Sequence, residues 1–340
     1  MAPAGFASGG SFLCQMKGIV MRWGILGAAN FARNHMGPAI HAAKGAELVA
    51  LATSDPAKAE GFSAFAPGLR VHGDYEALLA DPGVDAVYIP LPNHLHVDWS
   101  VKALEAGKHV LCEKPIALRA DEIDRVIAAR DASGRMAAEA FMVVHHPQFV
   151  RARELVQGGA IGRLRHAQVN FTFNNPDSAN IRNKPETGGG ALPDIGCYAI
   201  GSVRFVTGAE PVAVTHARLD WENGVDTFAQ VAADFGDFTY GAVVSTRMQT
   251  AQSVMFHGDA GHITLTAPFN AGVYDQAELV LETEGGTRSV ERWPGVNHYV
   301  LQVEAFGRAA VGEGYACPLE FSRGTQAMMD MIYDAGNRAG

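Results

Sequence analysis

The stretch RWGILGAANFA, residues 22–32, decides the fold. Its apolar first half, residues 22–26, predicts a buried strand, and Gly27 permits a tight turn into a helical stretch that runs toward Ala43. The amides at the start of such a helix can bind a pyrophosphate. Ala29 and Ala32 stand where the pattern Gly-x-Gly-x-x-Gly has its second and third glycines. Alone, the turn therefore fits either a dinucleotide site or ordinary packing in an α/β protein.

Predicted strands and helices alternate along the chain beyond this turn. Such alternation is typical of a parallel, doubly wound sheet. It favours a dinucleotide site at Gly27 and predicts a Rossmann dinucleotide-binding domain over residues 21–143. The predicted strands are residues 47–53, 84–89, 109–112 and 136–140, and the predicted helices are residues 56–65, 75–80, 94–106 and 120–132.

The length and charge of the chain restrict its class. Its 340 residues exceed what one core usually holds, so we expect a second domain over residues 144–340. The formal charge is -9, with 27 Lys plus Arg against 36 Asp plus Glu, which argues against nucleic acid and anionic membranes as partners. No apolar run approaches the ~18 residues that span a bilayer. We therefore expect a soluble protein.

The cysteines and the first residues bear on the compartment. The four cysteines are far apart and form no Cys-x-x-Cys pair, so neither a zinc site nor a disulfide scaffold is expected, as is typical of a reducing cytoplasm. Residues 1–20 have no basic residue ahead of their short apolar patch, unlike a signal peptide. We expect a disordered extension there, with Met21 as a possible native start. The cysteines are Cys14, Cys112, Cys197 and Cys317.

The end of the second predicted strand bears on the choice between NADP and NAD. An acid at this position accepts hydrogen bonds from the ribose hydroxyl of NAD and repels the 2′-phosphate of NADP. Here the tip is Thr53-Ser54, with Lys58 one turn into the next helix, and these groups suit a phosphate. We therefore expect NADP, with NAD less favoured. Asp55 is contrary evidence, although Ser54 or Asp55 can equally cap the helix.

The loop after the predicted strand at residues 84–89 contains Pro90, Leu91, Pro92, Asn93, His94 and His96. The prolines stiffen a loop that should lie over the cofactor, and Asn93 can cap the helix that follows. His94 and His96 have the spacing of a metal pair, but no carboxylate or cysteine accompanies them in the sequence. We favour a role in the cofactor loop and expect no metal site.

Glu113-Lys114-Pro115 follows the strand at residues 109–112 and supplies the first catalytic candidate. Active sites of open α/β sheets lie at such strand ends. Partial desolvation would lower the pKa of Lys114 and make its amine usable in proton transfer. A turn in which Lys114 simply pairs with Glu113 is the alternative, and the tripeptide alone favours it.

A second group of candidates follows the glycines at residues 188–190. The spacing Asp194-x-x-x-Tyr198 places both side chains on one helix face, about a turn apart. The glycines let the chain turn tightly near a ligand, and Pro193 is compatible with a first helical turn. Alternatively, Asp194 is a first-turn charge favoured by the helix dipole and Tyr198 is a packing residue.

The rest of the second half predicts antiparallel strands and two closing helices. Arg182, ahead of the glycines, is a candidate ligand for substrate hydroxyls or a structural salt bridge. His146 and His298 are weaker substrate-binding candidates, since a lone histidine is more often a packing residue. The expected strands are residues 211–220, 227–235, 238–246, 253–257, 263–266 and 278–282, and the helices are residues 297–311 and 319–335.

The turn at Gly27, the loop at residues 92–96, Glu113-Lys114-Pro115 and the stretch GGGALPDIGCY at residues 188–198 occur here in one order. Together they resemble the Gfo/Idh/MocA oxidoreductase family from Met21 to the C-terminus. Residues 141–147 and 180–182 look closest to its aldose dehydrogenases and dimeric dihydrodiol dehydrogenases. The resemblance implies a Rossmann domain followed by an α/β domain whose open, mostly antiparallel sheet serves homodimer contact and substrate binding.

The resemblance also implies roles for individual residues. Lys114 is the catalytic lysine, Asp194 its polar partner and Tyr198 the acid/base. Many relatives have histidine in place of Tyr198, and tyrosine points toward the sugar oxidoreductases. The expected cofactor-binding residues are Gly27, Ala28, Ala29, Asn30, Phe31, Thr53, Ser54, Lys58, Pro90, Leu91, Asn93, His96, Glu113, Lys114 and Pro115, and the expected substrate-binding residues are Arg182, Asp194, Tyr198, His146 and His298.

These residues together predict an NADP-dependent oxidoreductase that oxidises an aldose at its anomeric carbon to the lactone. Tyr198 would take the hydroxyl proton, and a neighbouring ammonium at Lys114 would lower its pKa from about 10. Four alternatives stay open: an aldose-aldose oxidoreductase that retains its NADP, a trans-dihydrodiol dehydrogenase, an NAD-dependent glycosidase and a non-catalytic sugar sensor.

Overall fold

The structure is a computed structural model that describes residues 20–337. The expected extension, apart from Val20, and Cys14 therefore lie outside the described residues. The other cysteines, Cys112, Cys197 and Cys317, are free and buried. Among the helices described, none is both long and apolar enough to cross a membrane.

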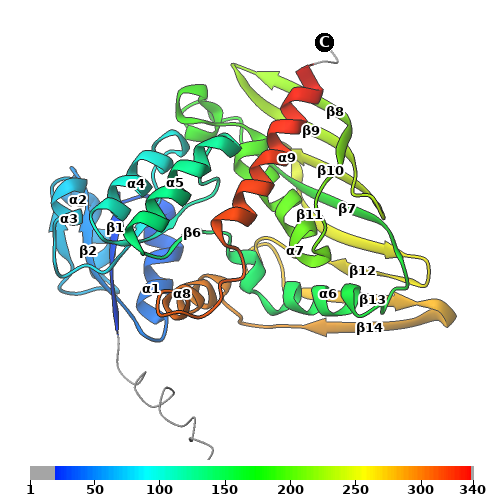
Figure 1. Ribbon diagram of the computed structural model, residues 1–340, viewed down its shortest axis with the longest axis horizontal. Coiled ribbons are helices and arrows are strands. Elements are labelled where there is room, and N and C mark those ends of the chain that lie inside the picture. The colour runs from blue at the N-terminus through cyan, green and yellow to red at the C-terminus, as the bar shows by residue number, and fades with distance from the viewer. Residues whose placement is uncertain (1–19, 338–340) are drawn as a thin grey trace, which may run out of the picture.

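The first sheet has six strands in the order β3-β2-β1-β4-β5-β6, all parallel (Figure 1). The predicted doubly wound parallel sheet is confirmed, and the short β3 is an addition to it. The strand order reverses between β1 and β4, and ligands of open α/β sheets bind beside such a reversal. The strands are β1 Met21–Leu26, β2 Ala46–Ala52, β3 Arg70–His72, β4 Ala86–Ile89, β5 His109–Cys112 and β6 Ala137–Glu139.

Capping residues mark the ends of several helices in this lobe. Asp55 accepts a hydrogen bond from the Ala57 amide (3.1 Å) and caps α2, and Asp74 caps α3 through the Ala77 amide (2.7 Å). Gly134, with φ 63°, ends α5. The helices are α1 Gly37–Ala42, which a π-helical turn Ala32–Met36 precedes, α2 Pro56–Ser63, α3 Tyr75–Leu79, α4 His96–Glu105 and α5 Ala120–Ser133.

The second sheet has eight strands in the order β14-β13-β12-β11-β7-β10-β9-β8. Only the pair β7 and β10 is parallel, so the predicted mostly antiparallel sheet is confirmed. The central β7 and the edge strand β14 are additions to the predicted strands. The strands are β7 Leu164–Asn174, β8 Ala213–Glu222, β9 Val225–Asp234, β10 Thr239–Ser245, β11 Arg247–Gly258, β12 Gly261–Leu265, β13 Glu278–Thr283 and β14 Thr287–Arg292.

The helices of the second half join the two lobes. α8 His298–Ala309 returns to the first lobe, where it packs against α1 and places Phe306 5.2 Å from the Trp23 ring. α9 Leu319–Asn337, red in Figure 1, runs from α5 along α7 to β8. The predicted boundary between residues 143 and 144 falls inside a 3-10 turn, Met142–His145, and stays a prediction. The remaining helices, α6 Pro147–Gln157 and α7 Cys197–Thr207, pack against the second sheet.

Candidate active site

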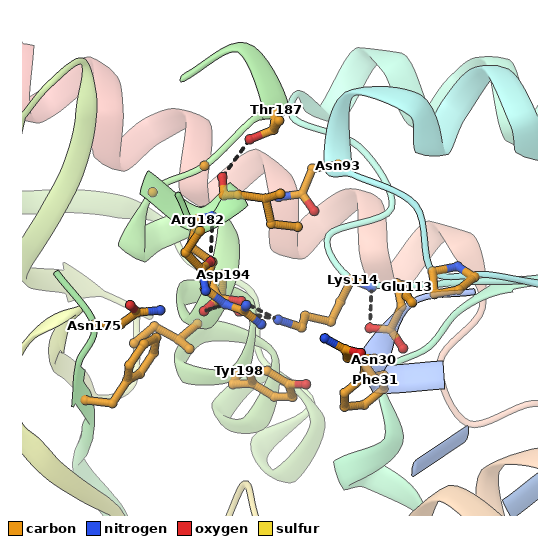
Figure 2. A pocket seen from close by; sticks show the side chains of 18 of the residues that line it. Asn30, Phe31, Asn93, Glu113, Lys114, Asn175, Arg182, Thr187, Asp194 and Tyr198 are labelled. Carbon is orange, nitrogen blue, oxygen red and sulfur yellow. Dashed lines mark hydrogen bonds and ion pairs between the residues drawn. The ribbon is translucent and has the colours of Figure 1, made fainter. Parts of the chain in front are cut away.

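A cavity of about 680 Å³ lies between the lobes at the carboxyl ends of the parallel strands (Figure 2). All three predicted catalytic residues line it, as does Arg182. Besides Lys114, eight of the predicted cofactor-binding residues also line it: Ala29, Asn30, Phe31, Pro90, Leu91, Asn93, His96 and Glu113. The structure therefore gathers the two groups of sequence candidates at one place.

The turn after β1 shapes the cofactor end of this cavity. Gly27 has φ +102°, and a Cβ there would lie 3.0 Å from the Leu91 side chain. Ala29, Asn30 and Phe31 follow at the cavity wall, where the Phe31 ring lies 5.6 Å from the Tyr299 ring. Backbone amides beside a tight glycine turn and a flat aromatic wall fit the pyrophosphate and rings of a nicotinamide dinucleotide.

Lys114 extends from the end of β5 toward the second lobe, as Figure 2 shows. Its Nζ donates hydrogen bonds to the carbonyl oxygen of Asp194 (2.6 Å) and to Asp194 Oδ1 (2.8 Å). One of the three ammonium hydrogens is then left for a ligand. Glu113, the alternative partner for Lys114, instead accepts a hydrogen bond from the Tyr88 hydroxyl and one from the Lys114 amide (3.3 Å).

The predicted lowering of the Lys114 pKa is wrong. Burial does lower the pKa of this amine, but the attraction of the Asp194 carboxylate outweighs it, and the net pKa lies above the ordinary value. Lys114 is therefore an ammonium in the unliganded protein and acts as a donor and a positive charge.

Asp194 is held by a π-helical turn, Leu192–Gly196, where the spacing Asp194-x-x-x-Tyr198 predicts ordinary helix. The buried Asp226 accepts a hydrogen bond from the Leu192 amide (2.8 Å) and one from the Tyr333 hydroxyl (2.8 Å), which anchors the turn. The Asp194 carboxylate binds Lys114 through Oδ1 and the Arg182 Nε through Oδ2 (2.7 Å). Burial raises its pKa, but the two cations outweigh burial and lower the pKa to about 2.

Tyr198 lies below this ion group in Figure 2, and its hydroxyl is directed toward Asn30 and Phe31. Its ring stacks on Phe141 (5.5 Å), and its hydroxyl donates to the sulfur of Met142 (3.4 Å). Burial raises its pKa well above 10. The expected lowering by Lys114 is therefore not found, because Asp194 binds that ammonium and the Lys114 Nζ lies 5.2 Å from the ring centroid.

The loop at residues 90–96 contacts both lobes. His96 is buried, and its ring nitrogens lie 2.7 Å from the Leu91 and Pro115 carbonyl oxygens. Asn93 caps no helix, contrary to the expectation, and instead donates from Nδ2 to the Gly188 carbonyl (2.8 Å). His94 is exposed, and within residues 20–337 no group of three or more His, Cys, Asp or Glu could hold a metal ion.

The remaining predicted residues lie outside the cavity lining. Asp55 directs its carboxylate to the α2 cap, and Thr53 bonds with the Asp55 backbone, while Ser54 and Lys58 are exposed. Gly27, Ala28 and Pro115 also lie outside the lining, close in the chain to residues that belong to it.

His146 and His298 do not reach the cavity, so their prediction as substrate ligands is not supported. Both histidines are buried. His146 caps α6, and the His298 ring packs against the His146 ring, with ring centroids 6.0 Å apart. Burial lowers the pKa of each, to about 4 for His146 and about 3 for His298, so both are neutral packing residues.

Several lining residues were missed by sequence reasoning. Asn175, Gln252, Asn270 and Tyr299 reach the cavity from β11, from α8 and from loops after β7 and β12. Gln252 accepts a hydrogen bond from the Asn270 amide (3.2 Å), which orients its side chain. The alternation of residues 164–174, with Ala167, Val169 and Phe171 on the buried face, was the sequence signal for this side of the site.

Comparison with known proteins gives matches over most of the chain. Residues 21–141 match the oxidoreductase family with an NAD-binding Rossmann fold, GFO/IDH/MocA, and residues 149–264 match the GFO/IDH/MocA C-terminal domain. An uncharacterised oxidoreductase of Rhizobium meliloti is 39% identical over 94% of this chain and 98% of its own. A D-xylose 1-dehydrogenase (NADP(+)) of Haloferax volcanii is 36% identical over 93% and 97%. The crystal structure of a 3-ketoreductase from Actinomadura kijaniata, in complex with NADP and TDP-benzene, is similar with a TM-score of 0.86 and 28% identity, over 93% and 98%.

Proposed function

The chain belongs to the GFO/IDH/MocA oxidoreductase family, and on that premise we propose that it oxidises an aldose at its anomeric carbon to the lactone, with NADP as the oxidant. The observation that carries this proposal is the meeting of Lys114, Asp194 and Tyr198 at one wall of the cavity. The similarity to a D-xylose 1-dehydrogenase (NADP(+)) supports it.

The charges of the cavity favour a free sugar over a nucleotide sugar. Protein sites for phosphates usually supply arginine or lysine. Among the described lining residues, only Lys114 and Arg182 are cationic, and Asp194 already binds both. The neutral side chains of Asn175, Thr250, Gln252 and Asn270 supply hydrogen bonds suited to sugar hydroxyls.

One side chain takes the proton in this proposal, and a second holds the substrate oxygen. When bound, NADP accepts a hydride from the substrate carbon. Tyr198, in its phenolate form, takes the hydroxyl proton of the same carbon and becomes the neutral phenol, while the free N–H of Lys114 holds the substrate oxygen. The positive charge of Lys114 stabilises the phenolate form of Tyr198 once a substrate oxygen lies between them. Asp194 and Arg182 keep the ammonium in place.

The surroundings of the second strand's end support NADP. The Asp55 carboxylate accepts the α2 cap bond through Oδ1, which leaves one of its oxygens for other partners. Ser54 and Lys58 are exposed beside it and can receive a 2′-phosphate. We propose these two residues as the determinants of cofactor choice.

We also propose a homodimer through the second sheet, in the cytoplasm. Its strands carry exposed apolar side chains: Trp221 is 49% exposed and Met248 is 42% exposed. The free buried cysteines suit a reducing compartment. Light scattering on the purified protein tests the dimer.

The test of function is a panel of aldoses, a TDP-sugar and a trans-dihydrodiol with NADP and NAD, followed by absorbance of the reduced cofactor. Aldoses deuterated at C1 are expected to transfer deuterium to NADP. Turnover of only the TDP-sugar or only the dihydrodiol would contradict the proposal. So would sugar conversion with no net reduction of the added NADP, as a retained-cofactor aldose-aldose oxidoreductase would give.

A further inference from the structure

We propose that Arg182 is a positioning residue that acts through Asp194 on Lys114 and thereby sets the pH range of turnover. This inference rests on the proposed function of the cavity. It differs from the sequence interpretation of Arg182 as a substrate ligand, because the guanidinium acts on the reaction through a second side chain.

The ion group gives each oxygen of Asp194 its own cation. Arg182 Nε donates to Oδ2 at 2.7 Å, and Lys114 Nζ donates to Oδ1 at 2.8 Å. The Asp194 and Lys114 side chains are 11% and 13% exposed, so water competes weakly for their bond, whereas the Arg182 side chain is 41% exposed. With Oδ2 held by Arg182, the carboxylate cannot rotate away from Lys114.

The backbone of Arg182 is itself fixed by the chain around it. Its amide donates to Asn180 Oδ1 (3.0 Å), and its carbonyl accepts from the Gly190 amide (2.9 Å). A Cβ at Gly189 would lie 2.5 Å from the Arg182 carbonyl oxygen. Glycine at position 189 therefore lets the two backbone segments approach each other. This contact fixes the backbone position from which the Arg182 side chain extends.

The charge of Arg182 acts on proton transfer in a defined direction. Its positive charge lowers the pKa of Lys114, whereas Asp194 raises it. A neutral residue at position 182 would leave the Asp194 charge to Lys114 alone, so the pKa of the lysine would rise. The other titratable groups around Lys114 and Tyr198 are Glu113 after β5, Glu139 on β6, Cys197 on α7, His96 on α4 and Tyr299 on α8. The guanidinium also attracts the charged forms of Glu113 and Tyr198.

The kinetic test compares the wild type with Arg182→Gln and Arg182→Lys over pH 7 to 12, with saturating NADP and an aldose that the wild type oxidises, because the pKa of Lys114 lies above its ordinary value. In Arg182→Gln the midpoint of the kcat profile is expected to move about one unit to higher pH. Turnover at pH 7 is expected to fall about 10- to 100-fold. Arg182→Lys keeps the charge, so its midpoint should stay near that of the wild type.

The matched control is Arg247→Gln. Arg247 donates to the Asn175 carbonyl (2.8 Å) and to Asn183 Oδ1 (3.0 Å), so it supports the same segment without binding Asp194. Its removal is expected to leave the pH midpoint in place. An equal shift in both Gln variants would assign the effect to loop order and overturn the proposal.

A second measurement needs neither cofactor nor substrate. Acetylation of Lys114 by acetic anhydride, followed by peptide mass spectrometry from pH 9 to 12, reports the fraction of free amine. Its midpoint is expected to rise in Arg182→Gln and to stay in Arg247→Gln. An unmoved midpoint with only a raised KM would make Arg182 a substrate ligand. Absence of any turnover by the wild type would instead contradict the proposed function.

Discussion

Lys114 and Asp194 join the two lobes at the reacting end of the cavity, with the Lys114 Nζ 2.6 Å from the Asp194 carbonyl oxygen and 2.8 Å from its Oδ1. Their side chains are only 13% and 11% exposed. Breaking such a buried pair leaves an uncompensated charge and costs more than the loss of a surface pair.

Asp194→Asn is expected to lower the free energy of unfolding at pH 7 by about 3 kcal/mol or more, because it leaves Lys114 and Arg182 as neighbouring cations. Urea unfolding followed by circular dichroism measures this loss. Asp121→Asn, at a carboxylate whose side chain is 71% exposed in a surface pair with Arg119, is the matched control. A loss as small as that of the control would contradict a buried, cation-bound Asp194.

The same pair predicts how stability depends on pH. The folded pKa of Asp194, about 2, lies below the unfolded value. With an unfolded pKa of about 3.9, the group contributes about 2.6 kcal/mol above pH 5, and the contribution is lost as pH falls through the folded pKa. The stability difference between wild type and Asp194→Asn should therefore shrink by about 1 kcal/mol from pH 6 to pH 3. A difference that does not change with pH would mean that Asp194 has an ordinary pKa.

Gly189→Ala is expected to lower both turnover and thermal stability. The added methyl would meet the Arg182 carbonyl oxygen at 2.5 Å and displace the segment that carries the guanidinium. A destabilisation of about 1–3 kcal/mol is expected, measured by thermal unfolding. Gly307→Ala is the control, because no heavy atom lies within 4 Å of a Cβ at this position in α8. It should keep turnover and gain up to about 1 kcal/mol of stability. Equal behaviour of the two variants would contradict the account of Gly189.

Lys58→Ala is expected to weaken NADP more than NAD, raising the KM for NADP about tenfold, because one cation near the 2′-phosphate is lost. Initial rates with both cofactors measure the ratio. Lys44→Ala, at another exposed lysine of the first lobe, is the control and should leave the ratio unchanged. A ratio unchanged in Lys58→Ala would place the 2′-phosphate elsewhere.

Local patterns in the sequence predicted much of this architecture. The apolar strands 22–26 and 109–112 and the turn at Gly27 were recognisable because their signals lie within a few residues. The same holds for the sites at Lys114 and Tyr198, which follow a strand end and a glycine run.

Features that depend on distant residues were not predictable in this way. The π-helical turn at Leu192–Gly196 is anchored by Asp226, which lies in β9. The pKa of Lys114 depends on Asp194, a neighbour across 80 residues of chain. The return of α8 to the first lobe rests on contacts such as that of Trp23 with Phe306.

In the proposed NADP-dependent sugar oxidation, Tyr198 takes the substrate proton while the Lys114 ammonium holds the substrate oxygen. The most direct test of these roles measures kcat for the wild type, Lys114→Ala and Tyr198→Phe with one aldose that the wild type oxidises. NADP binding is measured alongside by fluorescence. We predict a loss of about 10² to 10⁴ in kcat for each variant, with the Kd for NADP nearly unchanged. Full turnover in both variants would contradict the account.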